Sequence, residues 1–92
     1  MKRSIFLKLK DLLQRNFLMD LKRFSAYDRI SEDLGLSPYE FQELIWHLEN
    51  EYNLYIPDQE IARMSTLKDL VACIDDHLQN SLLYPLFLAE AI

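Results

Sequence analysis

The sequence predicts an all-α protein, and two features of its composition and pattern support that fold class. The 92 residues include one glycine and three prolines, and no alternating β-branched run is flanked by hairpin turn residues. Apolar residues instead recur three and four positions apart in three separate segments. Half of the residues are apolar, so a chain of this length can bury one small core. We therefore expect a helical bundle.

The first predicted helix runs from about Ser4 to Met19. Its apolar residues follow helical spacing, and polar side chains fill the other face. The stripe consists of Ile5, Phe6, Leu9, Leu12, Leu13 and Phe17. Residues 20–36 show no sustained period, so we expect a long loop whose aromatic side chains pack against the bundle.

The second predicted helix has the clearest local signals. Ser37 suits the N-cap, Pro38 the first helical position, and Glu40 the third, which together make a capping box. Asn53 is expected to end the helix, because asparagine tolerates the left-handed conformation. The stripe that should face the core is Phe41, Leu44, Ile45, Leu48 and Tyr52.

Two further helices complete the predicted bundle. A short one should run from Asp58, which can cap it, to Met64. Thr66 and Asp69 form a second capping box, which opens a helix that reaches about Gln79. The stripe of this last helix is Leu67, Leu70, Val71, Ile74 and Leu78. The expected fold is thus three longer helices and one short helix.

We divide the chain into a bundle, residues 1–80, and an apolar C-terminal extension, residues 81–92. Nine of the twelve residues from Ser81 to Ile92 are apolar, enough to cause association if they stayed exposed. We expect this tail to fold back on the bundle, with docking onto a second copy or another protein as the alternative. Pro85 should separate the helical turns on either side of it.

Charge is distributed unevenly. Residues 1–24 hold seven Lys or Arg and two acids, a balance of +5, whereas residues 25–92 hold three and thirteen, a balance of −10. We expect the basic residues to form a solvated helix face that complements the acidic remainder. The alternative is a basic arm that contacts nucleic acid or an anionic surface.

Few residues in the chain are suited to catalysis or to metal binding. Cys73 is the only cysteine, and His47 and His77 are the only histidines, so neither a disulfide nor a zinc site is expected. We predict that both histidines lack carboxylate or thiol partners and that Cys73 acts as a small apolar side chain. No stretch approaches the roughly 20 apolar residues of a membrane span. We expect a soluble cytoplasmic protein that is not an enzyme.

Several short elements recur at a distinctive joint spacing in residues 28–78. These are Asp33-Leu34-Gly35, Glu43-Leu44-Ile45, Leu48-Glu49, Glu51-Tyr52, Ile56-Pro57-Asp58, Met64-Ser65-Thr66-Leu67 and Ile74. With this joint spacing, the middle of the chain resembles the acyl carrier protein family. The resemblance implies an acyl-carrier-type four-helix bundle, with the apolar tail as an extra feature.

The sequence departs from the family at the position of the modified serine. The family's spacing places the phosphopantetheine-bearing serine at Pro38, and proline has no hydroxyl. Ser37 takes the position of the family's capping aspartate, and we expect its hydroxyl to bind the backbone of Glu40. We therefore predict no cofactor, with phosphopantetheine on Ser37 as the alternative.

Carrier proteins present the start and solvent face of this helix to basic patches on their partners. The resemblance carries that role over to Tyr39, Glu40, Glu43, Trp46, Glu49 and Glu51. Trp46 is the residue of this set to test as an interface anchor, because aromatic residues are enriched among such anchors. The competing interpretation is that Trp46 packs on the edge of its own core, for example against the C-terminal tail.

Three functions remain open on the sequence. Our leading hypothesis is a degenerate carrier-like module that binds a protein partner through its acidic second helix, for example an enzyme of acyl or peptide assembly. The second is a working acyl or peptidyl carrier modified at Ser37. The third is an unrelated small helical binding protein.

Overall fold

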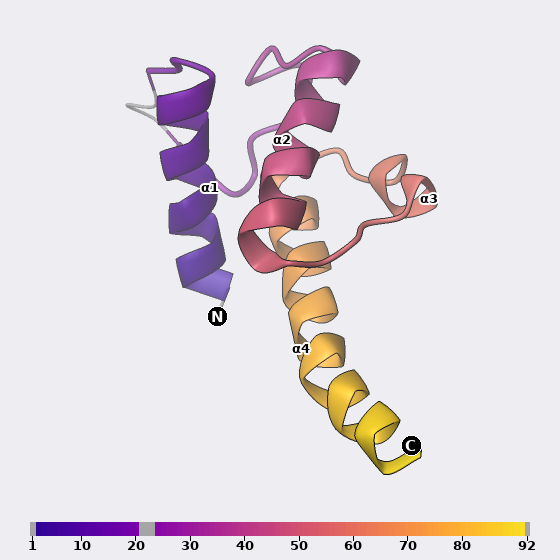
Figure 1. Ribbon diagram of the computed structural model, residues 1–92. Coiled ribbons are helices and arrows are strands. Elements are labelled where there is room, and N and C mark those ends of the chain that lie inside the picture. The colour runs from indigo at the N-terminus through magenta and orange to yellow at the C-terminus, as the bar shows by residue number, and fades with distance from the viewer. Residues whose placement is uncertain (1, 21–23, 92) are drawn as a thin grey trace.

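The computed structural model describes the backbone of residues 2–20 and 24–91 and the side chains within these ranges up to Asn80. Four helices follow one another: α1 (Lys2–Asn16), α2 (Pro38–Tyr52), α3 (Asp58–Ile61) and α4 (Leu67–Ala91). No β-strand occurs in the described ranges, so the predicted all-α class is confirmed. Figure 1 shows α1 beside α2 and α4, with the short α3 on the other side of α2.

Helix α1 packs against both α4 and α2, and the predicted stripes meet at this junction. The sequence placed the core correctly, because every fully buried residue of the long helices belongs to a predicted stripe. The buried apolar residues on the helices are Ile5, Leu9, Leu12, Leu13, Leu44, Ile45, Leu48, Leu67, Leu70, Val71 and Ile74. Ile30, Leu36 and Ile56 add to the core from the connecting segments.

The two predicted capping boxes are present. At the start of α4, the backbone N–H of Thr66 donates to Asp69 Oδ2 over 3.0 Å, and Asp69 N–H donates to Thr66 Oγ1 over 3.3 Å. At the end of α2, Asn53 adopts the left-handed conformation with φ 52°. The backbone N–H groups of Asn53 and Leu54 both donate hydrogen bonds to the carbonyl of Glu49.

Backbone hydrogen bonds join the long loop between α1 and α2 to the start of α4. Ile30 N–H donates to the carbonyl of Ser65 over 2.8 Å, and Leu67 N–H donates to the carbonyl of Asp28 over 3.0 Å. Phe24 packs its ring on Phe6 with centroids 4.6 Å apart, as expected of an aromatic residue in this loop. Tyr27 differs from the expectation, because it is exposed.

Three helix boundaries differ from the predictions. Helix α1 ends at Asn16 rather than near Met19, because Leu18 adopts φ 53°. Helix α3 ends at Ile61, and Asp58 is its first residue. The N-cap is Pro57, and no side chain caps the helix, so the predicted Asp58 cap is wrong.

Helix α4 continues to Ala91, well past the expected end near Gln79 and through Pro85. Among the described residues, none beyond Asn53 takes the left-handed conformation that commonly ends a helix. The prediction that Pro85 separates helical turns is therefore wrong. Figure 1 shows the last turns of α4 running beyond the ends of the other helices. The expected packing of the side chains of residues 81–92 lies outside the described side chains and stays a prediction.

Within the described ranges, no helix has the length and apolar character that crossing a bilayer would require.

Candidate functional site

The start of α2 has the predicted geometry. Ser37 is the N-cap, Pro38 is the first helical residue, and the backbone N–H of Glu40 donates to Ser37 Oγ over 3.1 Å. The backbone N–H of Ser37 donates to Glu40 Oε1 over 3.0 Å. This backbone hydrogen bond, with a further contribution from the Ser37 side chain, lowers the pKa of Glu40. Ser37 nevertheless remains exposed to solvent.

A hollow of about 380 Å³ opens beside Ser37, between the start of α2, the end of the long loop and the segment around α3. Its apolar lining includes Leu36, Phe41, Ile61 and Met64, and Gln42 adds an amide. Ser37 and Pro38 both line it. A volume in the range of about 300–1,000 Å³ is typical of small-molecule sites. The hollow and the exposed hydroxyl of Ser37 together form the first candidate site.

A second hollow, of about 420 Å³, lies on the outer face of α2. Tyr39, Gln42, Glu43 and Trp46 line it. Tyr39 is 79% exposed and Trp46 is 59% exposed, although the Trp46 ring also meets the ring of His47 edge-on at 5.1 Å. Large exposed aromatic side chains are typical of the residues that anchor protein interfaces, and here they lie beside an acidic side chain.

Three of the six residues expected to bind a partner are instead engaged within the chain. Glu40 completes the capping box. Glu49 Oε2 accepts from the backbone N–H of Ile56 over 2.9 Å, which fixes the turn after α2. Glu51 pairs with Lys8 of α1 at 2.9 Å. The structure therefore brings Tyr39, Glu43 and Trp46 together and gives the other three acids local roles.

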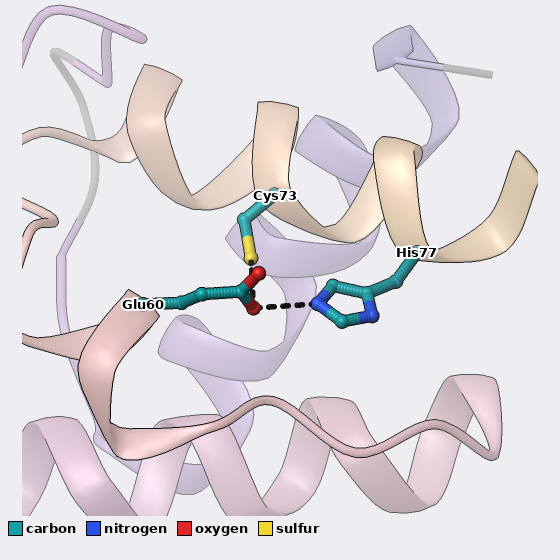
Figure 2. A group of neighbouring side chains, drawn as sticks. All are labelled: Glu60, Cys73 and His77. Carbon is teal, nitrogen blue, oxygen red and sulfur yellow. Dashed lines mark hydrogen bonds and ion pairs between the residues drawn. The ribbon is translucent and has the colours of Figure 1, made fainter. Parts of the chain in front are cut away.

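A side-chain cluster that the sequence did not predict lies between α3 and α4. Figure 2 shows Glu60 reaching from α3 to both Cys73 and His77 of α4. His77 Nε2 lies 2.6 Å from Glu60 Oε2, and the Cys73 sulfur donates to the same oxygen over 3.7 Å. The expectation that His77 lacks a carboxylate or thiol partner is therefore wrong. Its partner Glu60 is 17 residues away in sequence, so only the fold brings them together.

The thiol of Cys73 is a poor nucleophile in this setting. Burial, followed by the negative charge of Glu60, raises the pKa of Cys73 to about 11. The thiol is therefore protonated at neutral pH, which agrees with the expectation that Cys73 is not a catalytic nucleophile. His47 lies elsewhere, between the rings of Phe17 and Trp46.

The basic residues of α1 are partly matched by acids. Lys8 pairs with Glu51, and Arg15 pairs with Asp11 at 2.7 Å. Lys2 and Arg3 line a third hollow of about 330 Å³ together with Lys68 of α4. The ion pair between Lys8 of α1 and Glu51 of α2 joins a basic helix to an acidic one. Such pairing is what the uneven charge distribution predicts.

Comparison with known proteins gives a consistent result. No protein-family model matches the chain. An acyl carrier protein of Lactobacillus acidophilus is 34% identical over 74 residues, which covers 80% of this chain and 92% of the relative. An acyl carrier protein of Clostridium acetobutylicum is 29% identical over 76 residues, which covers 83% of this chain and 99% of the relative.

Comparison with solved structures finds the fold of an acyl carrier protein. The crystal structure of an acyl carrier protein from Thermotoga maritima superposes with a TM-score of 0.80 at 23% identity, covering 86% of this chain and 92% of that chain. The hypothesis of an unrelated helical binding protein loses its support.

These relatives overturn the expectation of no cofactor. They are acyl carrier proteins, the family whose prosthetic group is phosphopantetheine. The expectation rested on Pro38, which has no hydroxyl, and on the capping role of Ser37. It gave too little weight to the exposed hydroxyl one residue earlier, at the edge of the hollow.

Proposed function

Because the chain belongs to the acyl carrier protein family, we propose that it is an acyl carrier that bears phosphopantetheine on Ser37. The observation that carries this proposal is the position of Ser37, exposed at the start of α2 and lining the hollow of about 380 Å³. Phosphopantetheine, once attached, supplies the thiol on which an acyl chain is carried. Members of this family are carriers and not enzymes, and the same holds for this chain.

The capping role of Ser37 is compatible with attachment. The hydrogen bond from Glu40 N–H uses a lone pair of Ser37 Oγ and leaves the hydroxyl hydrogen for exchange. Esterification replaces that hydrogen and keeps the oxygen in place. A phosphate at this position would also lie at the N-terminus of α2, where the helix dipole and the backbone N–H groups favour an anion.

The hollow would shelter the beginning of the carried chain. Its lining includes Leu36, Phe41, Ile61 and Met64, which contribute apolar surface next to the attachment point. Gln42 replaces the small aliphatic residue that the family resemblance leads one to expect, and its amide makes that side of the hollow polar. We infer that a short or polar acyl group fits better than a long saturated chain.

The test of attachment is an intact-mass measurement after incubation with coenzyme A and a broad-specificity phosphopantetheinyl transferase. We expect a gain of one phosphopantetheine in the wild type and in Ser31→Ala, whose serine also lines the hollow. Ser37→Ala should show no gain. An unmodified wild type, or a gain that persists in Ser37→Ala, contradicts the proposal.

The exposed face of α2 is proposed as the surface that meets the partner enzyme. Tyr39 and Trp46 supply aromatic anchors and Glu43 supplies charge for a basic patch on an enzyme of acyl assembly. Trp46→Ala and Glu43→Lys should weaken binding of that enzyme by at least about tenfold, since central anchors contribute more than about 1.4 kcal/mol each. Gln14→Ala, an exposed change on α1, is the matched control. Equal affinities for all three variants would argue against this surface.

Two further features belong to the same proposal. The single reduced cysteine suits a carrier in the cytoplasm. Helix α4 continues to Ala91, beyond the other helices, and we propose that the apolar residues of the tail, residues 81–92, form a contact with a second copy of the chain.

A further inference from the structure

The cluster of Glu60, Cys73 and His77 combines three kinds of metal-binding group. Among the residues that the structure describes, these three offer one ligand atom each, and all three atoms lie within 4.8 Å of one another. Cys73 and His77 are four residues apart on α4, so one helical turn places both on the same face. Glu60 approaches from α3, as Figure 2 shows.

We propose that Glu60, Cys73 and His77 form a binding site for Zn²⁺ that joins α3 to α4. Three protein ligands of sulfur, nitrogen and oxygen type, with a fourth position left open, match the zinc sites of metalloproteins. Mg²⁺ and Ca²⁺ fit poorly, because they prefer a shell made of oxygen atoms alone. This proposal replaces the sequence-based expectation that the chain has no metal site.

The three ligand atoms lie within 4.8 Å of one another, and two of the three distances between them can be compared with those of a tetrahedral zinc site. Zinc bonds of about 2.0–2.3 Å set neighbouring ligand atoms roughly 3.2–3.8 Å apart in a tetrahedron. The sulfur of Cys73 already lies 3.7 Å from Glu60 Oε2. His77 Nε2 is 2.6 Å from the same oxygen, so that pair must open by roughly 1 Å. Rotation of the half-exposed Glu60 side chain can provide this movement.

The open fourth position has room for a water molecule or another ligand. A hollow of about 320 Å³ adjoins the cluster, and Asp76 lines it on α4. Zinc would form a Zn–S bond to Cys73 while the S–H bond breaks and its proton passes to solvent. The hydrogen bond between His77 and Glu60 would be exchanged for two bonds to the metal.

A metal at this position would act on the candidate carrier site through α3. This helix has only four residues, and no side chain caps it. Ile61 and Ala62, directly after Glu60, line the hollow beside Ser37. Zinc binding would therefore fix one wall of that hollow. The binding itself does not depend on attachment of phosphopantetheine, so failure of one proposal leaves the other standing.

The experiment uses the full, reduced chain in a non-chelating thiol-free reductant, titrated with Co²⁺ as the optical probe and with Zn²⁺ as competitor. We expect one metal per chain, a sulfur-to-cobalt charge-transfer band that Zn²⁺ abolishes, and a higher melting temperature with Zn²⁺. Cys73→Ser, His77→Gln and Glu60→Gln should each weaken binding by at least about tenfold, the scale measured even for residues that only support a ligand.

His47→Gln is the matched control, because it removes the chain's other histidine and should leave both affinity and the charge-transfer band unchanged. Helical circular dichroism checks that each variant folds. The wild-type band reports thiolate ligation without any variant. The proposal is overturned if that band is absent, if Cys73→Ser and His77→Gln bind as tightly as the wild type, or if His47→Gln loses binding equally.

Discussion

Ser37 shows how one side chain can serve both the fold and the candidate site. Its hydroxyl accepts a hydrogen bond from the backbone N–H of Glu40, and its own backbone N–H donates to the Glu40 carboxylate. Two backbone N–H groups at the start of α2 therefore have acceptors. The same residue is the exposed alcohol beside the apolar hollow. Stability and attachment can therefore be separated by choosing substitutions that keep the cap and remove the alcohol.

Ser37→Ala should lower the free energy of unfolding by about 1 kcal/mol, because alanine leaves the N–H of Glu40 without its acceptor. Ser37→Asp should stay within about 0.5 kcal/mol of the wild type, because aspartate caps as well as serine. Urea denaturation followed by circular dichroism measures both. Equal stability of the alanine and aspartate variants would show that the cap contributes nothing.

The hydrogen bonds of Asp69 should make the stability of the fold depend on pH in the acid range. Backbone hydrogen bonds from Ser65 and Thr66 lower the pKa of Asp69 below its ordinary value of 3.8. A folded-state pKa below the unfolded one means that the stabilisation is complete above about pH 5 and is lost as pH falls through the folded value. Glu40, whose pKa is also lowered, acts in the same direction.

We therefore expect the free energy of unfolding to fall steadily below about pH 4.5, and to fall less steeply in Asp69→Asn. Urea denaturation at a series of pH values measures the slope. If the free energy of unfolding has the same pH dependence in the wild type and in Asp69→Asn, Asp69 does not contribute to the loss of stability in acid.

At the scale of the elements, α2 is positioned by one residue before it, one in its last turns and one after it. Gly35 adopts φ +70° just before α2, Asn53 adopts φ 52° just after it, and Glu49 binds Ile56 across the turn that follows. These residues orient α2 between the long loop and α3. The hollow beside Ser37 depends on them, because its walls come from all three segments.

Gly35→Ala tests this orientation. A Cβ at Gly35 would meet nothing within 4 Å, so the cost is that of a left-handed backbone alone. We expect a loss of about 1 kcal/mol in the free energy of unfolding, and a smaller loss for Gly35→Asn, because asparagine tolerates this conformation better. Chemical denaturation compares the two, and an alanine variant as stable as the wild type would contradict the expectation.

At the scale of the whole molecule, one small core carries most of the stability. Leu44 is fully buried where α2 meets the other helices, whereas Leu7 of α1 is 53% exposed. Leu44→Ala should cost about 2–5 kcal/mol, a large part of the total stability of a domain this size. Leu7→Ala is the matched control and should cost under about 1 kcal/mol. Similar costs for both, in urea denaturation, would place the core elsewhere.

The extension of α4 leads to a prediction about association. Residues 82–92 are rich in leucine and aromatic side chains, and the last turns of α4, which ends at Ala91, run past the other helices. Removing residues 82–92 should turn a concentration-dependent dimer into a monomer while leaving the melting temperature of the bundle nearly unchanged. Sedimentation velocity over a range of concentrations measures this. A full-length chain that stays monomeric at every concentration would refute it.

The sequence alone determined the fold class, the family, the apolar stripes, the two capping boxes and the role of Asn53. These features follow from spacing within about one or two helical turns, where periodicity and capping chemistry act locally. Only the tertiary structure decided that Leu18 ends α1, that Glu49 and Glu51 serve the fold, and that α4 continues through Pro85. It alone also brought Glu60 to Cys73 and His77, because contacts between residues far apart in sequence depend on how the helices pack.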